Sequence, residues 1–220
     1  MEIKPIAFIQ NDFTDKFAIP RQSGLTDIKS KIVFEDEYSD ANALRGLEDF
    51  SHIWLIWGFS KNIREKHSLT VRPPRLGGNT RVGVFASRSP FRPNNLGLSC
   101  VKLVEIKNGE IIVSGADLMN GTPIYDIKPY INYSDSVPEA KSGYVDTVEF
   151  PELEVEIKAS LLNGISEEKR NTLIEILKKD PRPAYQREEN RDYGFTFAGY
   201  EIKFSVKDGI LKVKDITNEQ

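Results

Sequence analysis

Six short runs of β-branched and aromatic residues occupy the first 118 residues, and little helical pattern lies between them. The runs are Ile3–Ile9, Lys31–Glu35, His52–Phe59, Arg81–Ala86, Leu98–Ile106 and Glu110–Leu118. Gly, Pro, Asn and Asp bound them, as is typical of strands. Lys107–Glu110 reads Lys-Asn-Gly-Glu, and Asn-Gly between two such runs predicts a two-residue hairpin turn. Because few helices separate the strands, the sequence favours an antiparallel barrel or sandwich over a doubly wound parallel sheet.

The clearest helix pattern lies in the last third of the chain, over Ser166–Asp180. Its first serine can cap the helix, and the two glutamates that follow complement the positive end of the helix dipole. Asp180–Pro183 reads Asp-Pro-Arg-Pro and ends it. In the first part of the chain only Ser39–Phe50 has helical spacing, with Ser39 or Asp40 as its N-cap.

Strand candidates flank the late helix. Leu153–Leu162 precedes it, and Phe195–Val206 and Ile210–Val213 follow it as a closing hairpin. We therefore expect a mainly β chain. Residues 1–145 are predicted to form a single antiparallel β-barrel, and residues 146–220 a small α+β domain packed on it.

The composition bounds the class of protein. Of the 220 residues 39% are hydrophobic, which is enough to bury a core. The single cysteine, Cys100, argues against a disulfide framework and against a thiolate metal site. The apolar run Ile53–Phe59 is too short to span a bilayer, and the N-terminal residues lack the pattern of a signal peptide. We expect a cytoplasmic protein with no membrane segment and no bound metal.

The charge is distributed unevenly along the chain. The formal net charge is −3, yet the segment from Lys61 to Lys102 holds nine lysines and arginines against one glutamate, Glu65. This segment therefore carries about +8 and the remainder about −11. A local field of that sign attracts phosphates and other anions even on an acidic protein. A solvated charged face is the alternative, but these arginines lie among Gly, Pro and Asn, which favours contact with a ligand.

Several familiar catalytic signatures are absent from the sequence. It contains no G-x-G-x-x-G, no Walker loop, no H-E-x-x-H and no G-x-S-x-G. His52 and His67 have no partner at the spacing of metal ligands, and the apolar neighbours of His52 favour a buried, hydrogen-bonded histidine over a ligand. Serines without a base nearby in sequence argue against a hydrolase triad.

Four loop segments instead combine backbone-controlling residues with polar side chains. They are Ile19–Leu25, Val71–Asn79, Gly83–Ser99 and Ala116–Tyr130. Each pairs Pro or Gly with Arg, Asn, Asp or Thr, which present hydrogen-bond donors and acceptors. Loops that only connect strands do not need this density of charged and amide groups. The residues alone favour an anionic or nucleotide ligand held in loops at one end of a barrel, with plain structural turns as the alternative.

These segments carry a resemblance to a known family. "IPRQ" (19–22), "GLEDFSHIWLIW" (46–57), "RPPRLGGNTRVGVFASRSPFRPNNLGLS" (72–99), "DLMNGTPIYDIKPY" (117–130) and "DPRPAYQ" (180–186) resemble the TrmO family of S-adenosylmethionine-dependent tRNA adenine-N6 methyltransferases. The resemblance implies that S-adenosylmethionine binds to a β-barrel rather than to a Rossmann fold. It also implies a tRNA substrate whose adenosine beside the anticodon already carries a threonylcarbamoyl group on N6, and a homodimer.

The resemblance also implies which residues bind the cofactor. They are Pro20, Arg21, Gln22, Ser60, Lys61, Arg88, Leu98, Asp117, Asn120, Gly121 and Thr122. Family members often have His where this chain has Ser60, and usually Asp where it has Asn120. The asparagine can still accept a hydrogen bond through its carbonyl oxygen, but it brings no negative charge to a sulfonium.

The chemistry of the reaction suggests further candidates. A threonylcarbamoyl adenine has a weakly nucleophilic, urea-like nitrogen, so an acceptor for its proton would help catalysis. Asp126 is the candidate base and Tyr130 lies nearby in sequence, while a structural pairing of Asp126 with Lys128 or an arginine is the alternative. Candidates for substrate and tRNA contacts are Arg72, Arg75, Arg92, Asn94, Arg182 and Tyr185. For the last two, contacts in a dimer or a plain helix stop are the alternatives.

Two other functions fit the same residues. One is a barrel that binds a nucleotide or RNA without chemistry, since arginine-rich loops alone would serve that purpose. The other is a methyltransferase whose acceptor is a small molecule or a protein.

Overall fold

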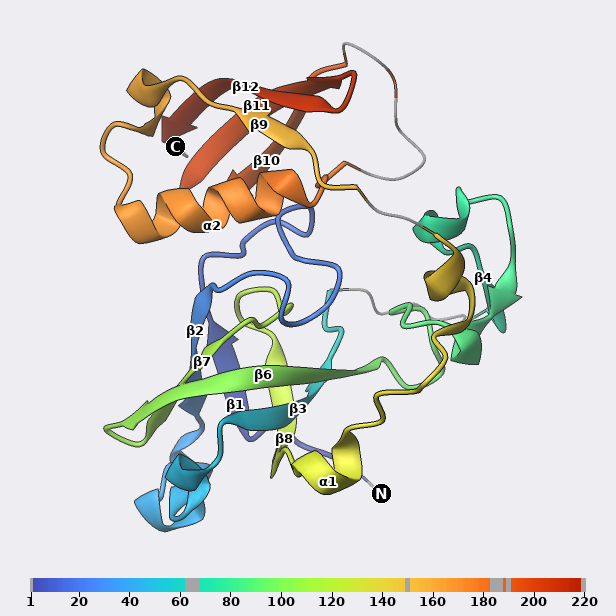
Figure 1. Ribbon diagram of the computed structural model, residues 1–220. Coiled ribbons are helices and arrows are strands. Elements are labelled where there is room, and N and C mark those ends of the chain that lie inside the picture. The colour runs from blue at the N-terminus through green and yellow to red at the C-terminus, as the bar shows by residue number, and fades with distance from the viewer. Residues whose placement is uncertain (1, 62–67, 149–150, 183–187, 189–190, 219–220) are drawn as a thin grey trace.

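The computed structural model describes residues 2–61, 68–148, 151–182, 188 and 191–218. Its first part is a closed barrel with the strand order β1-β2-β7-β6-β3-β8 (Figure 1). These strands are β1 (Ala7–Gln10), β2 (Lys29–Phe34), β3 (His52–Gly58), β6 (Leu96–Lys107), β7 (Glu110–Ser114) and β8 (Pro123–Pro129). Every pairing among them is antiparallel. The predicted antiparallel barrel is therefore confirmed.

The hairpin between β6 and β7 turns where the Asn-Gly pair predicts it. Lys107 pairs with Glu110, and Asn108 and Gly109 have φ values of 54° and 79°. Both values lie in the left-handed region that an Asn-Gly turn adopts readily. The strand predicted over Ile3–Ile9 begins later, at Ala7, and β8 lies within a segment read from sequence as loop.

Several expectations about local structure were wrong. The strand expected over Leu153–Leu162 is reduced to Glu154–Glu156 with a 3₁₀ turn over Ala159–Leu162, and a turn divides Phe195–Val206 between two strands. The segment Ser39–Phe50 forms two 3₁₀ turns, Ala41–Leu44 and Leu47–Asp49, instead of one helix. Gly46 between them has φ 84°, which a continuous right-handed helix cannot accommodate. The strand predicted over Arg81–Ala86 is reduced to the two residues of β5, and a 3₁₀ turn follows it.

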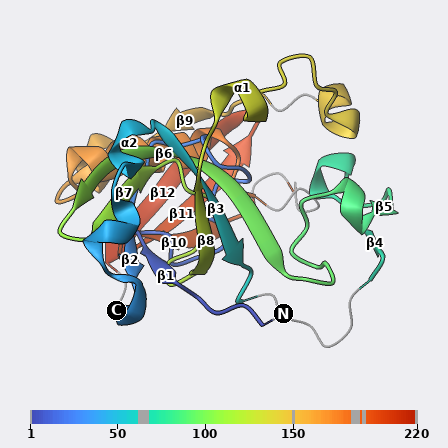
Figure 2. The same cartoon turned by 90° about the horizontal axis from the view of Figure 1, so that it is seen from below.

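A short arm stands beside the barrel. It contains β4 (Thr70–Val71) paired with β5 (Val82–Gly83), and the 3₁₀ turns Pro74–Leu76 and Val84–Ala86. Figures 1 and 2 both show this arm to one side of the barrel wall, connected to the start of β6. It carries Arg72, Arg81 and Arg88 in exposed positions. The arginines of this part of the predicted basic segment thus project from the barrel.

The chain leaves β8 through the short helix α1 (Asn132–Asp135) and the 3₁₀ turn Gly143–Thr147, and then forms a second sheet. This sheet has the order β10-β11-β12-β9, and helix α2 (Glu167–Lys178) packs on it. The strands are β9 (Glu154–Glu156), β10 (Tyr193–Phe197), β11 (Tyr200–Lys207) and β12 (Ile210–Asn218), and a 3₁₀ turn covers Ala159–Leu162. The predicted late helix is confirmed, with the Ser166 side chain accepting from the Lys169 backbone N–H.

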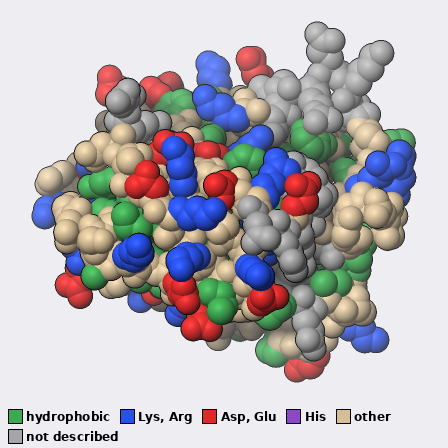
Figure 3. Space-filling model, turned by 90° about the horizontal axis from the view of Figure 1, so that it is seen from above, with side chains coloured by type: hydrophobic (Ala, Val, Ile, Leu, Met, Phe, Trp, Pro, Cys, Tyr) green, Lys and Arg blue, Asp and Glu red, His purple; other side chains and the backbone are tan. Residues whose placement is uncertain are grey.

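Opposite charges alternate over the second sheet and helix, as Figure 3 shows from above. Ion pairs join Lys203 to Glu201 at 3.5 Å and Lys212 to Glu156 at 3.7 Å. Because both signs are mixed on this face, it offers phosphates no uniform basic field. The concentration of arginines on the barrel side is the better match for an anionic partner.

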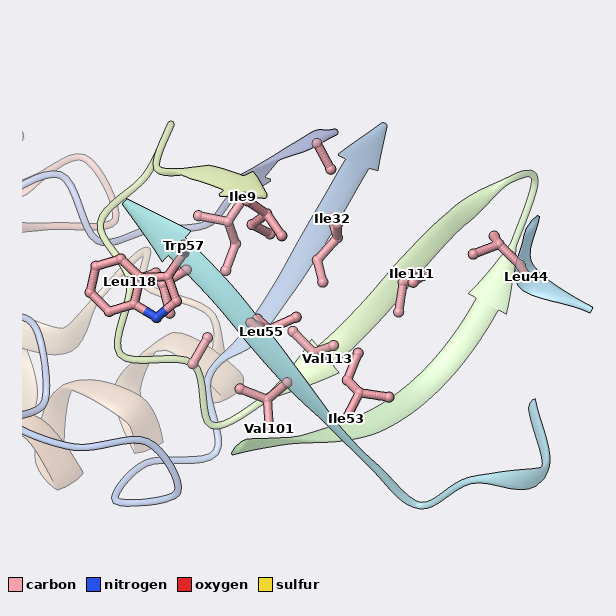
Figure 4. Packing of buried hydrophobic residues seen from close by; sticks show 13 residues of the cluster. Ile9, Ile32, Leu44, Ile53, Leu55, Trp57, Val101, Ile111, Val113 and Leu118 are labelled. Carbon is pink, nitrogen blue, oxygen red and sulfur yellow. The ribbon is translucent and has the colours of Figure 1, made fainter. Parts of the chain in front are cut away.

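The described residues form two hydrophobic cores. One fills the barrel with residues such as Ile9, Leu55 and Val113, which point inward from alternate strand positions (Figure 4). The other lies between α2 and the second sheet. Phe13 and Ile28, which come from the N-terminal part of the chain, also belong to this second core. The loop between β1 and β2 therefore fixes the C-terminal unit to the barrel.

Within the part of the chain that the structure describes, no helix has the length and apolar character needed to cross a membrane.

Candidate functional site

Asp117 lies at one end of the barrel, directly after the strand β7 and its bend at Gly115. The Ser99 Oγ, on β6, donates a hydrogen bond to its Oδ1 over 2.5 Å. The Trp57 Nε1, on β3, donates in turn to the Ser99 Oγ over 2.9 Å. Ser99 and Trp57 are only 1% and 6% exposed, because both side chains point into the barrel. One wall of the barrel thus fixes the orientation of this carboxylate.

Burial dominates the electrostatic environment of Asp117. Burial raises the pKa of the Asp117 carboxyl above its ordinary value, and this is the largest effect. The Ser99 hydroxyl, the Arg88 guanidinium and the Ser23 backbone N–H act in the opposite direction and lower that pKa. A carboxylate in such surroundings attracts a cation more strongly than a solvated one, since the local dielectric constant is lower.

The loop Ile19–Leu25 closes over Asp117 from the other side. The Arg88 guanidinium donates a hydrogen bond to the Gln22 Oε1 and lies within electrostatic range of Asp117. Three residues that the resemblance assigns to the cofactor, Gln22, Arg88 and Asp117, therefore lie together although they are far apart in sequence. The cluster presents one cation and one anion, which match the carboxylate and the amino group of an amino acid.

The segment after Asp117 is held by the end of β1. The Gly121 N–H donates to the Ile9 carbonyl over 2.8 Å, and the Asn120 N–H donates to the Phe13 carbonyl over 2.8 Å. The Asn120 Oδ1 accepts from the Asn11 N–H over 3.1 Å. Thr122 is buried, with 5% exposure. The Asn120 Oδ1 therefore supports the loop, and its second lone pair leaves it able to accept a hydrogen bond from a ligand as well.

Arg21 points toward the C-terminal unit. Its Nη2 donates to the backbone carbonyls of Asp180 and Arg182 over 3.3 Å and 3.4 Å. Arg182 itself forms a bidentate pair with Asp180, at 2.8 Å and 3.0 Å, and only 10% of its side chain is exposed. Arg21 thus connects the loop Ile19–Leu25, which also holds the half-buried Pro20, to the turn that ends α2. Tyr185 lies outside the described residues.

The remaining cofactor candidates lie at the rim of the same barrel end. Ser60 and Lys61 follow β3 and are exposed. Leu98 on β6 is 56% exposed, and its partner in the sheet is Ile56. Because Leu98 precedes the inward-facing Ser99, its side chain lies on the outer face of the barrel. The structure does not bring that side chain to Asp117.

Asp126 and Tyr130 lie on β8 and just after it. Asp126 pairs with Ile56 in register, forms an ion pair with Lys128 at 3.0 Å and accepts from the Ile127 N–H. The Tyr130 ring packs against His52 and Trp54 at the other end of the strand. The structure therefore does not join these two residues to the Asp117 cluster, and the Lys128 pair agrees with the structural alternative for Asp126.

The substrate and tRNA candidates between Arg72 and Asn94 divide into one bracing residue and exposed polar residues. The Arg92 Nη1 donates to the Ser87 carbonyl over 2.9 Å and stiffens its own loop. Arg72 and Asn94 are exposed. Arg75 lies in the 3₁₀ turn Pro74–Leu76, and its side chain lies outside the described residues. Among the described residues no group of three His, Cys, Asp or Glu side chains is placed to hold a metal ion.

Comparison with known proteins identifies the family. Residues 8–136 match the tRNA-methyltransferase O N-terminal domain, and residues 147–219 match the TrmO C-terminal domain. The chain belongs to the TrmO family. A tRNA (adenine(37)-N6)-methyltransferase of Escherichia coli is 38% identical over 225 residues, which cover 96% of each chain.

Two further relatives bear on the cofactor and the fold. An S-adenosyl-L-methionine-binding protein of Archaeoglobus fulgidus is 36% identical over 137 residues, covering 62% of this chain and 94% of that protein. The crystal structure of TrmO from Pseudomonas aeruginosa superposes with a TM-score of 0.79 at 30% identity and covers 99% of both chains. The family and the non-Rossmann barrel expected from sequence are both confirmed.

Sequence reasoning missed the residues that support the Asp117 cluster. Ser99 and Trp57 appear in the quoted family segments, but nothing in their spacing shows that they touch. Asn11 was not singled out, yet its side chain holds the Leu118 carbonyl and the Ser30 Oγ. The usable signal was the alternation of β3 and β6, which turns Trp57 and Ser99 to the same interior.

Proposed function

We propose that this chain transfers a methyl group from S-adenosylmethionine to N6 of a tRNA adenosine. The proposed adenosine lies beside the anticodon and already carries a threonylcarbamoyl group. The cluster of Gln22, Arg88 and Asp117 at the barrel end carries the proposal, because it places a cation and a half-buried anion side by side. Membership of the TrmO family, with the methyltransferase of Escherichia coli as a full-length relative, supports the reaction and the substrate.

The residues of the cluster fit the methionine end of the cofactor. S-adenosylmethionine supplies an activated methyl group on a sulfonium, so the protein mainly provides position and electrostatics. Arg88 can pair with the carboxylate, since its guanidinium lies at the site whereas Arg21 is turned to the C-terminal unit. Asp117 can accept from the amino group and offset the positive charge nearby.

The decisive experiment measures the product. Radiolabelled methyl transfer to tRNA that carries the threonylcarbamoyl group should be detected with the purified protein. Mass spectrometry of tRNA nucleosides from a strain lacking the gene should show loss of the N6-methylated form. Binding of S-adenosylmethionine without incorporation would favour a binding barrel, and an unchanged nucleoside profile would point to another acceptor.

The transfer forms an N–C bond, breaks the S–C bond and releases the N6 proton. Asp126 remains the proposed acceptor of that proton, although its pair with Lys128 favours a structural role. If Asp126 is the base, Asp126→Ala should lower turnover by about 100-fold, in the range of general-base effects, and leave cofactor affinity unchanged. Single-turnover methylation and calorimetry measure the two quantities. Unchanged turnover would leave Asp126 with its structural role and Tyr130 without a partner in catalysis.

The arginines of the arm are proposed to hold the tRNA and the threonyl carboxylate. We expect Arg75→Glu to weaken binding of modified tRNA more than binding of unmodified tRNA, because a carboxylate contact exists only in the former. The preference for modified tRNA should fall by about 10-fold, the value of one charge-assisted contact. Filter binding at fixed salt, with Arg81→Glu on the same arm as the comparison, measures this. An equal loss for both tRNAs would assign Arg75 to phosphate contact.

A homodimer is also proposed. Leu96, Leu98 and Val104 expose 36%, 56% and 44% of their surface along the outer face of β6, and Phe85 on the arm exposes 75%. Apolar side chains aligned in this way mark a surface that another protein covers. Sedimentation equilibrium should give twice the 25.0 kDa chain mass. A monomer mass at micromolar concentration would contradict the proposal, and Leu98→Glu should shift the equilibrium toward monomer.

A further inference from the structure

The carboxylate at the site is the last member of a buried chain of hydrogen bonds. Figure 4 shows Trp57 inside the barrel beside Leu118. The indole Nε1 of Trp57 donates a hydrogen bond to the Ser99 Oγ, and the Ser99 Oγ donates to the Asp117 Oδ1. We propose that Trp57 and Ser99 are positioning residues that hold Asp117 ionised and correctly oriented for the cofactor. This inference rests on the proposed function, in which Asp117 faces the amino group and sulfonium of S-adenosylmethionine.

The direction of the chain follows from the donors available. The indole Nε1 of Trp57 can only donate, so the Ser99 Oγ must accept from it. A hydroxyl has a single proton, and the remaining partner of Ser99 is the Asp117 Oδ1 at 2.5 Å. The proton of Ser99 therefore points to the carboxylate. A donor aimed at a carboxylate favours its ionised form, and the hydrogen bond is strengthened by the charge.

Steric constraints prevent the chain from rearranging. Gly97 stands opposite Trp57 in the β3–β6 pairing, and a Cβ at that position would lie 2.3 Å from the indole Cε2. The indole thus occupies the space that a side chain of residue 97 would need. The Phe59 ring also packs against the indole, with the two ring centroids 4.3 Å apart. Because Gly97 and Phe59 restrict the position of the indole, its Nε1 stays oriented toward the Ser99 Oγ.

The charged groups around Asp117 do not offset its burial by themselves, so the hydrogen bond from Ser99 helps to keep the carboxyl ionised. Burial works against ionisation of Asp117, and the Arg88 guanidinium from the arm side is the charged group that opposes it. The Ser23 backbone N–H from the facing loop and the Ser99 hydroxyl from β6 add neutral donors. Removing the hydroxyl takes away the largest of these opposing effects, so the pKa of Asp117 rises further. If cofactor binding needs the ionised Asp117 carboxylate, then on lowering the pH the affinity would be lost at a higher pH than in the wild type.

The test is the pH dependence of S-adenosylmethionine binding, measured by calorimetry between about pH 5.5 and about pH 8.5, a range that brackets shifted carboxyl groups. Ser99→Ala should weaken binding by about 10-fold at the acidic end, the value of a hydrogen bond to a charged group. The loss should be smaller at the alkaline end, because there Asp117 ionises without help. Ser99→Cys, a weaker donor of similar shape, should fall between the wild type and Ser99→Ala.

Trp57→Phe keeps an aromatic ring but removes the donor, so it should move the profile in the same direction by a smaller amount. The control is Thr172→Ala, which removes another buried hydroxyl, on α2 and away from the Asp117 cluster, that donates to the Glu168 carbonyl. Its profile should coincide with that of the wild type. If Ser99→Ala loses the same factor of affinity at every pH, or loses none, the proposed role of Ser99 and Trp57 is wrong. Failure of the wild type to bind S-adenosylmethionine would instead contradict the proposed function itself.

Discussion

Replacing Asp117 by asparagine is expected to weaken S-adenosylmethionine binding by about 100-fold, which corresponds to losing charge-assisted hydrogen bonds and the attraction to a nearby cation. The amide has nearly the shape of the carboxylate, so the Ser99 hydroxyl keeps an acceptor and the loop keeps its backbone contacts. Arg88 then lacks its balancing charge, and a cationic ligand meets a net positive site. Calorimetry with purified protein measures the affinity, and thermal unfolding checks that the fold is retained.

The matched control for this substitution is Asp15→Asn. The Asp15 carboxylate also accepts a backbone hydrogen bond, from the Phe17 N–H at 3.0 Å, but it lies outside the cluster. We expect its cofactor affinity to stay within about two-fold of the wild type, as for a surface change away from the site. An Asp117→Asn variant that binds the cofactor like the control would show that Asp117 does not face it.

Local signals explain which parts of the fold could be predicted. The helix over Ser166–Asp180 could be predicted because its N-cap, its terminal charges and the prolines that end it all lie within or next to the helix in the sequence. The Asn-Gly hairpin was found for the same reason. The segment Ser39–Phe50 misled because helical spacing of its apolar residues did not reveal the left-handed backbone at Gly46. The fold class could be inferred, but closure of the barrel depends on pairings between β1 and β8 that no local pattern encodes.

The sequence predicted which residues gather at the site better than it predicted what each of them does. The resemblance placed Gln22, Arg88 and Asp117 in one group, and the structure brings them together. It could not show that the Arg21 guanidinium turns to the Asp180 carbonyl, because that contact joins residues 159 positions apart. Arg92 is a comparable case, since its hydrogen bond to the Ser87 carbonyl supports a bracing role for a residue that the chemistry of the substrate suggested as a ligand contact.

Gly97→Ala should have the largest effect on stability among single-methyl changes at the site. The added Cβ would lie 2.3 Å from the Trp57 Cε2 and 2.4 Å from its Cζ2, and both atoms belong to a rigid ring packed in the core. Overpacking of this kind costs about 1–3 kcal/mol. Relief requires the indole to move, which also breaks its hydrogen bond to Ser99. We therefore expect the free energy of unfolding to fall by about 2–3 kcal/mol and cofactor affinity to fall with it.

Urea denaturation and calorimetry measure these two effects, and Gly83→Ala is the matched control on the neighbouring arm. Gly83 has φ −59°, which alanine adopts without strain, and no atom lies within 4 Å of its added Cβ. Its stability should stay within about 0.5 kcal/mol of the wild type. If Gly97→Ala lowers stability but leaves cofactor affinity intact, the position of the indole would matter for packing alone. Loss of both is the result expected if the core of the barrel is linked to the ligand through the hydrogen bonds from Trp57 to Ser99 and from Ser99 to Asp117.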